Sequence, residues 1–88
     1  MIKIVTYNIQ FGQGRDGKVD LGRIIDSVKG ADLIALQEVD RFWPRSGETD
    51  QVREIINAFE SFDYAYGPGV DQASGEIDYA GRPIRRQF

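Results

Sequence analysis

The chain has 88 residues, 41% of them apolar and 28% charged, which fits one small globular domain. Its net charge of −3 argues against a general nucleic-acid coat protein. The sequence has no cysteine and no histidine, which excludes a disulfide framework, a thiolate metal site and the commonest general base. No segment is long and apolar enough to span a membrane. The start carries no signal-peptide pattern, so we expect a cytoplasmic protein, although removal of a leader would leave the same start.

The first segment, "IKIVTYNI", alternates between two faces and is rich in β-branched residues. It predicts a strand over residues 2–7 with Asn8 at its end. The glycine-rich "FGQGRDGKV" that follows predicts a loop.

A helix is predicted over residues 20–29, with Asp20 as its N-cap. Its apolar residues follow the spacing i, i+3, i+4 and i+7: Leu21, Ile24, Ile25 and Val28. Gly30 stands where a left-handed residue ends a helix. The apolar run in "DLIALQ" then predicts a second strand over residues 32–37.

The second half of the chain repeats the order of helix and strand. A helix is predicted over 50–60, with Asp50 as its N-cap and one apolar stripe. "FDYAYGPG" predicts a third strand over 62–67, and its aromatic residues are expected in the core together with Phe59. "VDQASGEIDYAGRP" is polar and glycine-rich and predicts a loop, after which "IRRQF" has the composition of the start of a fourth strand.

The order β-α-β predicts a right-handed parallel pair formed by the first two strands. Both strands then end at the same edge of the sheet, which is where open α/β sheets bind ligands. Asn8 ends the first strand and Glu38 follows the second. We therefore expect both side chains to face one site.

A carboxylate and an amide oxygen are the hard ligands that Mg²⁺ prefers, with waters and phosphate oxygens completing its shell. Glu38 would supply charge, and Asn8 would bind directly or orient a water. On spacing alone another interpretation stays open: Glu38 caps a loop or pairs with Arg41 or Arg45, and Asn8 makes a turn hydrogen bond.

The loop after Glu38 holds two guanidinium groups and an indole, in Arg41, Arg45 and Trp43. Such a loop can contact phosphates and stack on a ring, so Arg41 and Arg45 are candidate substrate-binding residues. The alternative is a solvated loop with Trp43 packed on the core.

The segments "TYNIQFG" and "ADLIALQEVD" together resemble the endonuclease/exonuclease/phosphatase family, which includes pancreatic-type deoxyribonuclease, apurinic endonucleases, neutral sphingomyelinase and inositol polyphosphate 5-phosphatases. "RSGETDQ" and "YAYGPGVD" are similar to segments of bacterial members. The resemblance implies that Asn8 is an active-site residue and that Glu38 is a ligand of Mg²⁺, with Mn²⁺ as a substitute.

The resemblance also implies a two-sheet α/β sandwich of the deoxyribonuclease type, of which residues 1–88 would be an incomplete N-terminal portion. The parent protein would be a metal-dependent phosphodiesterase, nuclease or phosphatase acting on nucleic acid, a phospholipid head group or an inositol phosphate. The family's Asp-x-Asn segment and its late Asp-His pair have no counterpart in the sequence, so we expect the chain alone to be inactive. An incomplete sandwich would leave sheet edge and apolar surface uncovered, so we also expect the chain to self-associate through its exposed sheet, to pair with the missing portion, or to unfold easily. The alternative is a catalytically silent folding or interaction module.

Overall fold

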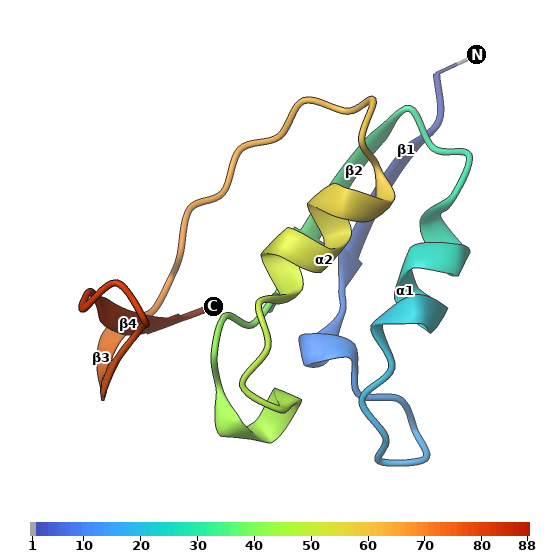
Figure 1. Ribbon diagram of the computed structural model, residues 1–88. Helices are drawn as coiled ribbons and strands as arrows, with labels where there is room; N and C mark the ends of the chain where they lie inside the picture. The colour runs from blue at the N-terminus through green and yellow to red at the C-terminus, as the bar shows by residue number, and fades with distance from the viewer. Residues whose placement is uncertain (1) are drawn as a thin grey trace. The chain divides into compact units, whose positions relative to one another are not determined.

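Two α-helices and two sheets of two strands each are found in residues 2–88, the part of the chain that the computed structural model describes (Figure 1). The expected α/β class is confirmed. The chain divides into Met1–Val39, called unit 1 below, and Asp40–Phe88, called unit 2. No helix among residues 2–88 has the length and apolar character needed to cross a bilayer.

The sheet of unit 1 is the predicted parallel pair. Strand β1 (Ile4–Asn8) lies beside β2 (Leu33–Gln37), with Ile4 opposite Leu33 and Asn8 opposite Gln37. The start of the pair is fixed by Asp32, whose carboxylate accepts a hydrogen bond of 2.7 Å from the backbone N–H of Lys3. Because the two strands run in the same direction and in register, their carboxyl ends meet at one edge.

Helix α1 (Leu21–Val28) lies where the apolar spacing predicted a helix and contributes Leu21, Ile24 and Val28 to the core of unit 1. The predicted N-cap role of Asp20 is correct in position only. The Asp20 side chain makes no capping hydrogen bond and lies 3.8 Å from the Arg23 guanidinium instead. After the helix, Gly30 has the left-handed φ of +87° that its position predicted.

One face of the β1–β2 sheet is apolar at one end and uncharged along its length. Alternation and register place six residues on this face: Ile4, Thr6, Asn8, Leu33, Ala35 and Gln37. The Gln37 amide donates to the Thr6 hydroxyl at 3.2 Å, as two side chains on one face can. Ile4 is 66% exposed and Leu33 52% exposed, so the apolar end of this face is open to solvent.

Unit 2 begins with the short 3₁₀ turn η2 (Pro44–Ser46) and helix α2 (Gln51–Ala58). The predicted cap of this helix is confirmed, because the Asp50 carboxylate accepts a hydrogen bond of 3.1 Å from the backbone N–H of Arg53. The apolar stripe of α2 is half-buried.

The predicted third strand over 62–67 is wrong. Residues 63–68 have no regular structure, and the expected core side chains include Tyr64, which is largely exposed, and Phe62, which lies at the surface. The alternating aromatic residues have the period of a strand. A strand also needs a neighbour to receive its backbone hydrogen bonds, and none is found for these residues in the described part of the chain.

The second sheet is an antiparallel hairpin of β3 (Asp71–Ile77) and β4 (Pro83–Gln87). The prediction of a fourth strand is confirmed, but the expected loop at "VDQASGEIDYAGRP" is wrong because it contains β3. The turn is held by Asp78, whose carboxylate accepts hydrogen bonds from the backbone N–H groups of Ala80 and Arg82 at 2.9 and 3.0 Å.

Candidate metal and phosphate site

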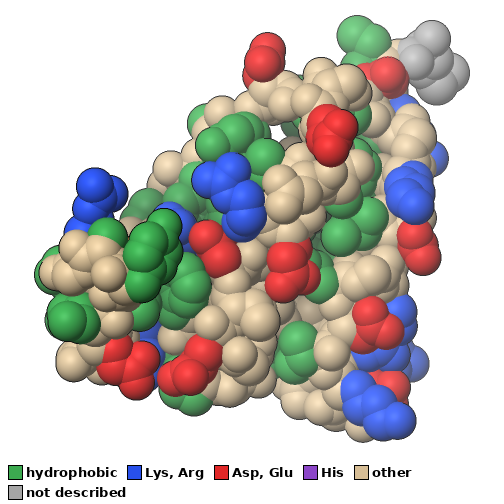
Figure 2. Space-filling model, viewed as in Figure 1, with side chains coloured by type: hydrophobic (Ala, Val, Ile, Leu, Met, Phe, Trp, Pro, Cys, Tyr) green, Lys and Arg blue, Asp and Glu red, His purple; other side chains and the backbone are tan. Residues whose placement is uncertain are grey.

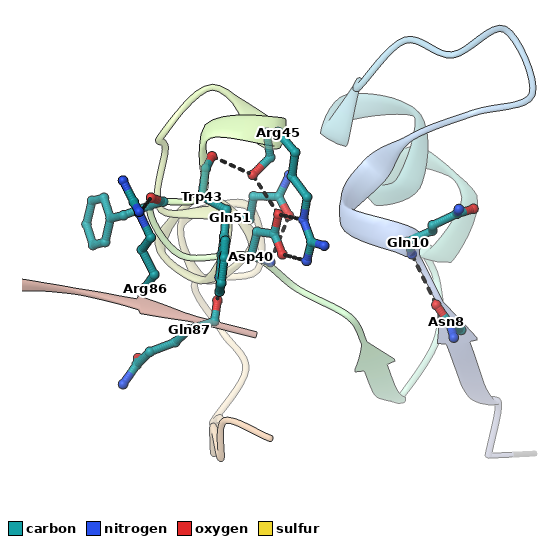
Figure 3. Close-up of polar contacts among 10 residues, drawn as sticks. Asn8, Gln10, Asp40, Trp43, Arg45, Gln51, Arg86 and Gln87 are labelled. Carbon is teal, nitrogen blue, oxygen red and sulfur yellow. Dashed lines mark hydrogen bonds and ion pairs between the residues drawn. The ribbon is translucent and has the colours of Figure 1, made fainter. Parts of the chain in front are cut away.

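Asn8 is the last residue of β1, and its side chain is exposed. The Asn8 Oδ1 accepts a hydrogen bond of 3.1 Å from the backbone N–H of Gln10, which forms the turn into the short 3₁₀ turn η1 (Gln10–Gly12) (Figure 3). This is the turn hydrogen bond that one interpretation of the sequence predicted. An amide oxygen has a second lone pair, so the same bond that fixes the Asn8 side chain leaves it able to bind a cation or a water.

Glu38 directly follows β2 and is exposed. Its backbone carbonyl accepts a hydrogen bond of 2.8 Å from the N–H of Phe11. Among residues 2–88 its carboxylate has no hydrogen-bond or ion-pair partner, and the two arginines considered as partners bind other carboxylates. The pairing of Glu38 with Arg41 or Arg45 stays an open alternative, although each arginine already has a carboxylate partner within unit 2.

The register brings Asn8 and Glu38 to the same edge of unit 1. Asn8 lies opposite Gln37, the residue before Glu38, and the N–H of Ile9 continues the ladder by donating to the Gln37 carbonyl at 3.0 Å. The predicted common edge is confirmed. The roles of the two side chains as metal ligands stay predictions.

This edge also carries unusual backbone angles. Glu38 has a φ of +58°, and the facing turn has +48° at Gln10 and +44° at Phe11. Residues other than glycine seldom adopt positive φ, and each costs about 1–2 kcal/mol relative to the usual helical region. Strain of this kind gathers at functional sites, where surrounding contacts hold it in place. The Phe11–Glu38 hydrogen bond is such a contact.

Arg41, a predicted substrate-binding residue, belongs to unit 2. Its guanidinium donates to both carboxylate oxygens of Asp50 at 3.1 Å and to the Gln87 side chain at 3.0 Å. The guanidinium carbon lies 5.9 Å from the centre of the Tyr66 ring. A phosphate at Arg41 would therefore have to compete with a bidentate carboxylate.

Arg45, the second predicted substrate-binding residue, is held more tightly. It donates to both oxygens of Asp40 at 2.9 and 2.8 Å, and Asp40 is fully buried. The Ser46 hydroxyl donates to the same carboxylate at 2.8 Å. The guanidinium carbon also lies 5.3 Å from the centre of the Trp43 ring and 4.6 Å from that of Phe88. Removing Arg45 from Asp40 would leave a buried carboxylate without its cation, which is costly.

Sequence reasoning missed an ion pair that orders the loop before α1. The Arg23 guanidinium donates to Asp16 at 3.0 and 3.3 Å and to the backbone carbonyl of Lys18 at 2.8 Å. The hydrogen bonds from Arg23 lower the pKa of the Asp16 carboxyl below its ordinary value. The segment "RDGK" indicates a turn. Its residues do not indicate that Arg23, in the first turn of α1, would hold that turn by binding Asp16 and the Lys18 carbonyl.

The donor set at the edge of unit 1 fits a weakly held hard cation. Asn8 and Glu38 offer oxygen ligands only, and Mg²⁺ commonly uses one or two protein oxygens with waters. Within residues 2–88 no group of three acidic, histidine or cysteine side chains comes together. Asn8 and Glu38 can thus form part of a magnesium site, but two ligands do not enclose the ion.

Comparison of the chain with protein-family models, with curated proteins and with solved structures gives no match, so the resemblance to the endonuclease/exonuclease/phosphatase family stays a prediction drawn from its strand-end segments.

Proposed function

We propose that this chain contributes part of the magnesium site of a metal-dependent hydrolase of phosphate esters, with Glu38 as the ligand and Asn8 as its support. The observation that carries the proposal is the exposed Glu38 carboxylate at the carboxyl edge of the parallel pair, beside Asn8 and without a protein partner among residues 2–88. The strained backbone of Glu38 adds support, because its φ of +58° has no evident benefit for stability.

Each residue has a defined part in this proposal. Glu38 holds the cation through its carboxylate. Asn8, whose amide is fixed by the hydrogen bond from Gln10, binds the cation directly or orients a water bound to it. When bound, Mg²⁺ supplies positive charge that offsets the charge of the phosphoryl group and the leaving oxygen.

Neither Asn8 nor Glu38 acts as the general base in this proposal, and the sequence contains no histidine to do so. Another group would take that role. The substrate is a phosphate ester, and nucleic acid, a phospholipid head group and an inositol phosphate all fit that chemistry. The deoxyribonuclease-like sandwich and the cytoplasmic location expected from the sequence belong to the same proposal.

A magnesium titration followed by NMR tests the metal role. In the ¹⁵N-labelled chain, Mg²⁺ should shift the backbone amides of Asn8, Gln10 and Glu38 more than those of unit 2. Glu38→Gln removes the ligand charge and should abolish these shifts while leaving the rest of the spectrum unchanged.

Glu48→Gln is the matched control, because Glu48 is also exposed, has the same φ of +58° and pairs only distantly with Arg86, at 3.7 Å. It should respond to Mg²⁺ like the unaltered chain. Equal small shifts along the whole chain would reject the metal site and favour the catalytically silent module.

A further inference from the structure

Most cations of the chain are already paired. Arg41 and Arg45 bind Asp50 and Asp40, and the other ion pairs among residues 2–88 are Arg23–Asp16, Arg23–Asp20, Lys29–Asp26, Arg85–Asp71 and Arg86–Glu48. Among residues 2–88, two exposed cations of unit 1 have no ionic partner and stand beyond the end of β1: Arg15 and Lys18. Arg41 and Arg45, which the sequence predicted as phosphate contacts, thus already bind carboxylates. Arg15 and Lys18 have no such partner and could bind a phosphate instead.

Both cations stand on the segment Gln13–Val19, called the 13–19 loop below, which is closed by several hydrogen bonds. Gln13 and Val19 form an antiparallel bridge. The N–H of Gly14 donates to the Lys18 carbonyl at 3.0 Å, and that of Gly17 donates to the Gly14 carbonyl at 3.0 Å. A loop held in this way presents its side chains with little further loss of conformational entropy on binding.

Arg23 of α1 fixes the 13–19 loop from outside and neutralises its acid. Its guanidinium lies against Gly14 so closely that a Cβ there would be 2.8 Å from Nη2. The same guanidinium binds the Asp16 carboxylate and the Lys18 carbonyl. Asp16 would otherwise repel an anion, so the pairing leaves Arg15 and Lys18 to set the charge that the loop presents.

The 13–19 loop lies at the end of unit 1 toward which β1 and β2 run (Figure 1). It follows η1 directly, and the N–H of Asp20 ties its far end back to the carbonyl of Gly12 at 3.0 Å. Where Figure 1 places this loop, Figure 2 shows basic and acidic side chains gathered together. The loop therefore lies at the same end of unit 1 as Asn8 and Glu38, with η1 between them in the chain.

We propose that the 13–19 loop binds the phosphate group of the substrate, with Arg15 and Lys18 as the contacts. This inference rests on the proposed function, which it deepens by naming the residues that receive the ester. A phosphate monoester carries a charge of about −2, and a Mg²⁺ held by the Glu38 carboxylate offsets only part of it, so negative charge remains to be balanced. A guanidinium can bind phosphate oxygens in pairs, and a lysine adds a point charge. Arg23 is a positioning residue, since it acts through the loop.

Titration of the 88-residue chain with inorganic phosphate, followed by NMR without metal, tests the inference. Phosphate should shift the amides of the 13–19 loop and the Arg15 side chain. Arg15→Ala should weaken phosphate binding about tenfold, the loss of one charge-assisted contact. Arg53→Ala is the matched control, because Arg53 is an exposed arginine of α2 with no ion-pair partner among residues 2–88, and it should bind phosphate normally.

Arg23→Gln tests the positioning role, because it releases the loop while Arg15 and Lys18 remain. It should weaken phosphate binding and sharpen the loop resonances, with the β1 and β2 signals unchanged as proof of folding. Equal phosphate affinity in Arg15→Ala and the unaltered chain would overturn the inference.

The magnesium titration separates the two proposals. Arg15→Ala should leave the Mg²⁺ shifts at Glu38 intact, which would support a phosphate contact distinct from the metal ligand. If phosphate binds the loop while Mg²⁺ leaves Glu38 unmoved, the loop inference is supported and the proposed function fails. If Mg²⁺ moves Glu38 and phosphate leaves the loop unchanged, the loop inference alone is wrong.

Discussion

At residue 38 an exposed carboxylate and a left-handed backbone occur together, directly after a strand. A glycine would adopt the φ of +58° without strain, and any polar residue would satisfy an exposed position. The side chain that stands there is instead charged and, among residues 2–88, has no partner. Its backbone is held by the hydrogen bond from Phe11. A residue of this kind lowers the stability of the fold, and a role in binding would explain why it stands at this position.

Glu38→Gly should therefore stabilise the chain while removing the metal ligand. Relief of about 1–2 kcal/mol of strain is partly offset by about 0.5–1 kcal/mol of added freedom in the unfolded chain. We expect the free energy of unfolding, measured in urea, to rise by up to about 1.5 kcal/mol relative to Glu38→Ala, which keeps the strain.

Glu48→Gly serves as the control, because Glu48 has the same φ. It should gain similar stability and keep the response to Mg²⁺, whereas Glu38→Gly should lose that response. A Glu38→Gly variant no more stable than Glu38→Ala would show that the backbone at this edge is unstrained.

Among the elements, those whose signal is local were predictable. The two helices and the parallel pair follow from the apolar period, and the edge shared by Asn8 and Glu38 follows from the parallel pair. The prediction of a strand over 62–67 was wrong because alternating side chains indicate only that a segment has one apolar face. They do not indicate that a neighbouring strand is present to receive its backbone hydrogen bonds. Of the hairpin, β4 was predicted and β3 was missed, because the sequence of β3 is polar and contains a glycine. The best sequence signal of the hairpin was Asp78 followed by Gly81, a turn between Ile77 and Ile84.

The parts of the site that sequence reasoning missed depend on pairings between elements. Arg41 and Arg45 were reasonable phosphate contacts as long as their carboxylates were unknown. Asp50, nine residues after Arg41, and the buried Asp40 take both guanidinium groups. The order of the 13–19 loop likewise depends on Arg23, seven residues beyond Asp16. The spacing of residues along the sequence does not show which carboxylate an arginine will bind in the folded chain.

The ion pair between Asp16 and Arg23, which helps to hold the 13–19 loop, should persist to a lower pH than that at which a free aspartate is protonated. The hydrogen bonds from Arg23 lower the pKa of folded Asp16, so the pairing is fully present above the ordinary aspartate pKa. It is lost only as the pH falls through the lowered value. A ¹³C NMR titration of the Asp16 carboxyl should give a midpoint below that of a free aspartate, and Arg23→Gln should raise it.

Asp71 provides the internal control, since the hydrogen bond from Arg85 lowers its pKa in the same way. Its midpoint should stay low in Arg23→Gln. If the Asp16 midpoint is the same with and without Arg23, the ion pair does not hold the loop in solution.

For the molecule as a whole, the uncharged face of the β1–β2 sheet is the surface through which we expect copies of the chain to meet. A net charge of −3 makes copies repel one another in general. The face that carries Ile4 and Leu33 has no charged residue, so two copies can meet there without like-charge contact. Within the described residues the sheet has two strands, which leaves unpaired backbone groups along its outer edges.

We therefore expect the chain to self-associate through this face, with a sedimentation coefficient that rises with concentration. Leu33→Lys should shift the chain toward the monomer, because it sets two like charges against each other and removes exposed apolar area. Ile77→Lys is the matched control, as Ile77 is 69% exposed on the hairpin of unit 2, and it should associate like the unaltered chain. Equal dissociation by both substitutions would point to general charge repulsion, and a concentration-independent monomer would show that the β1–β2 face needs no partner.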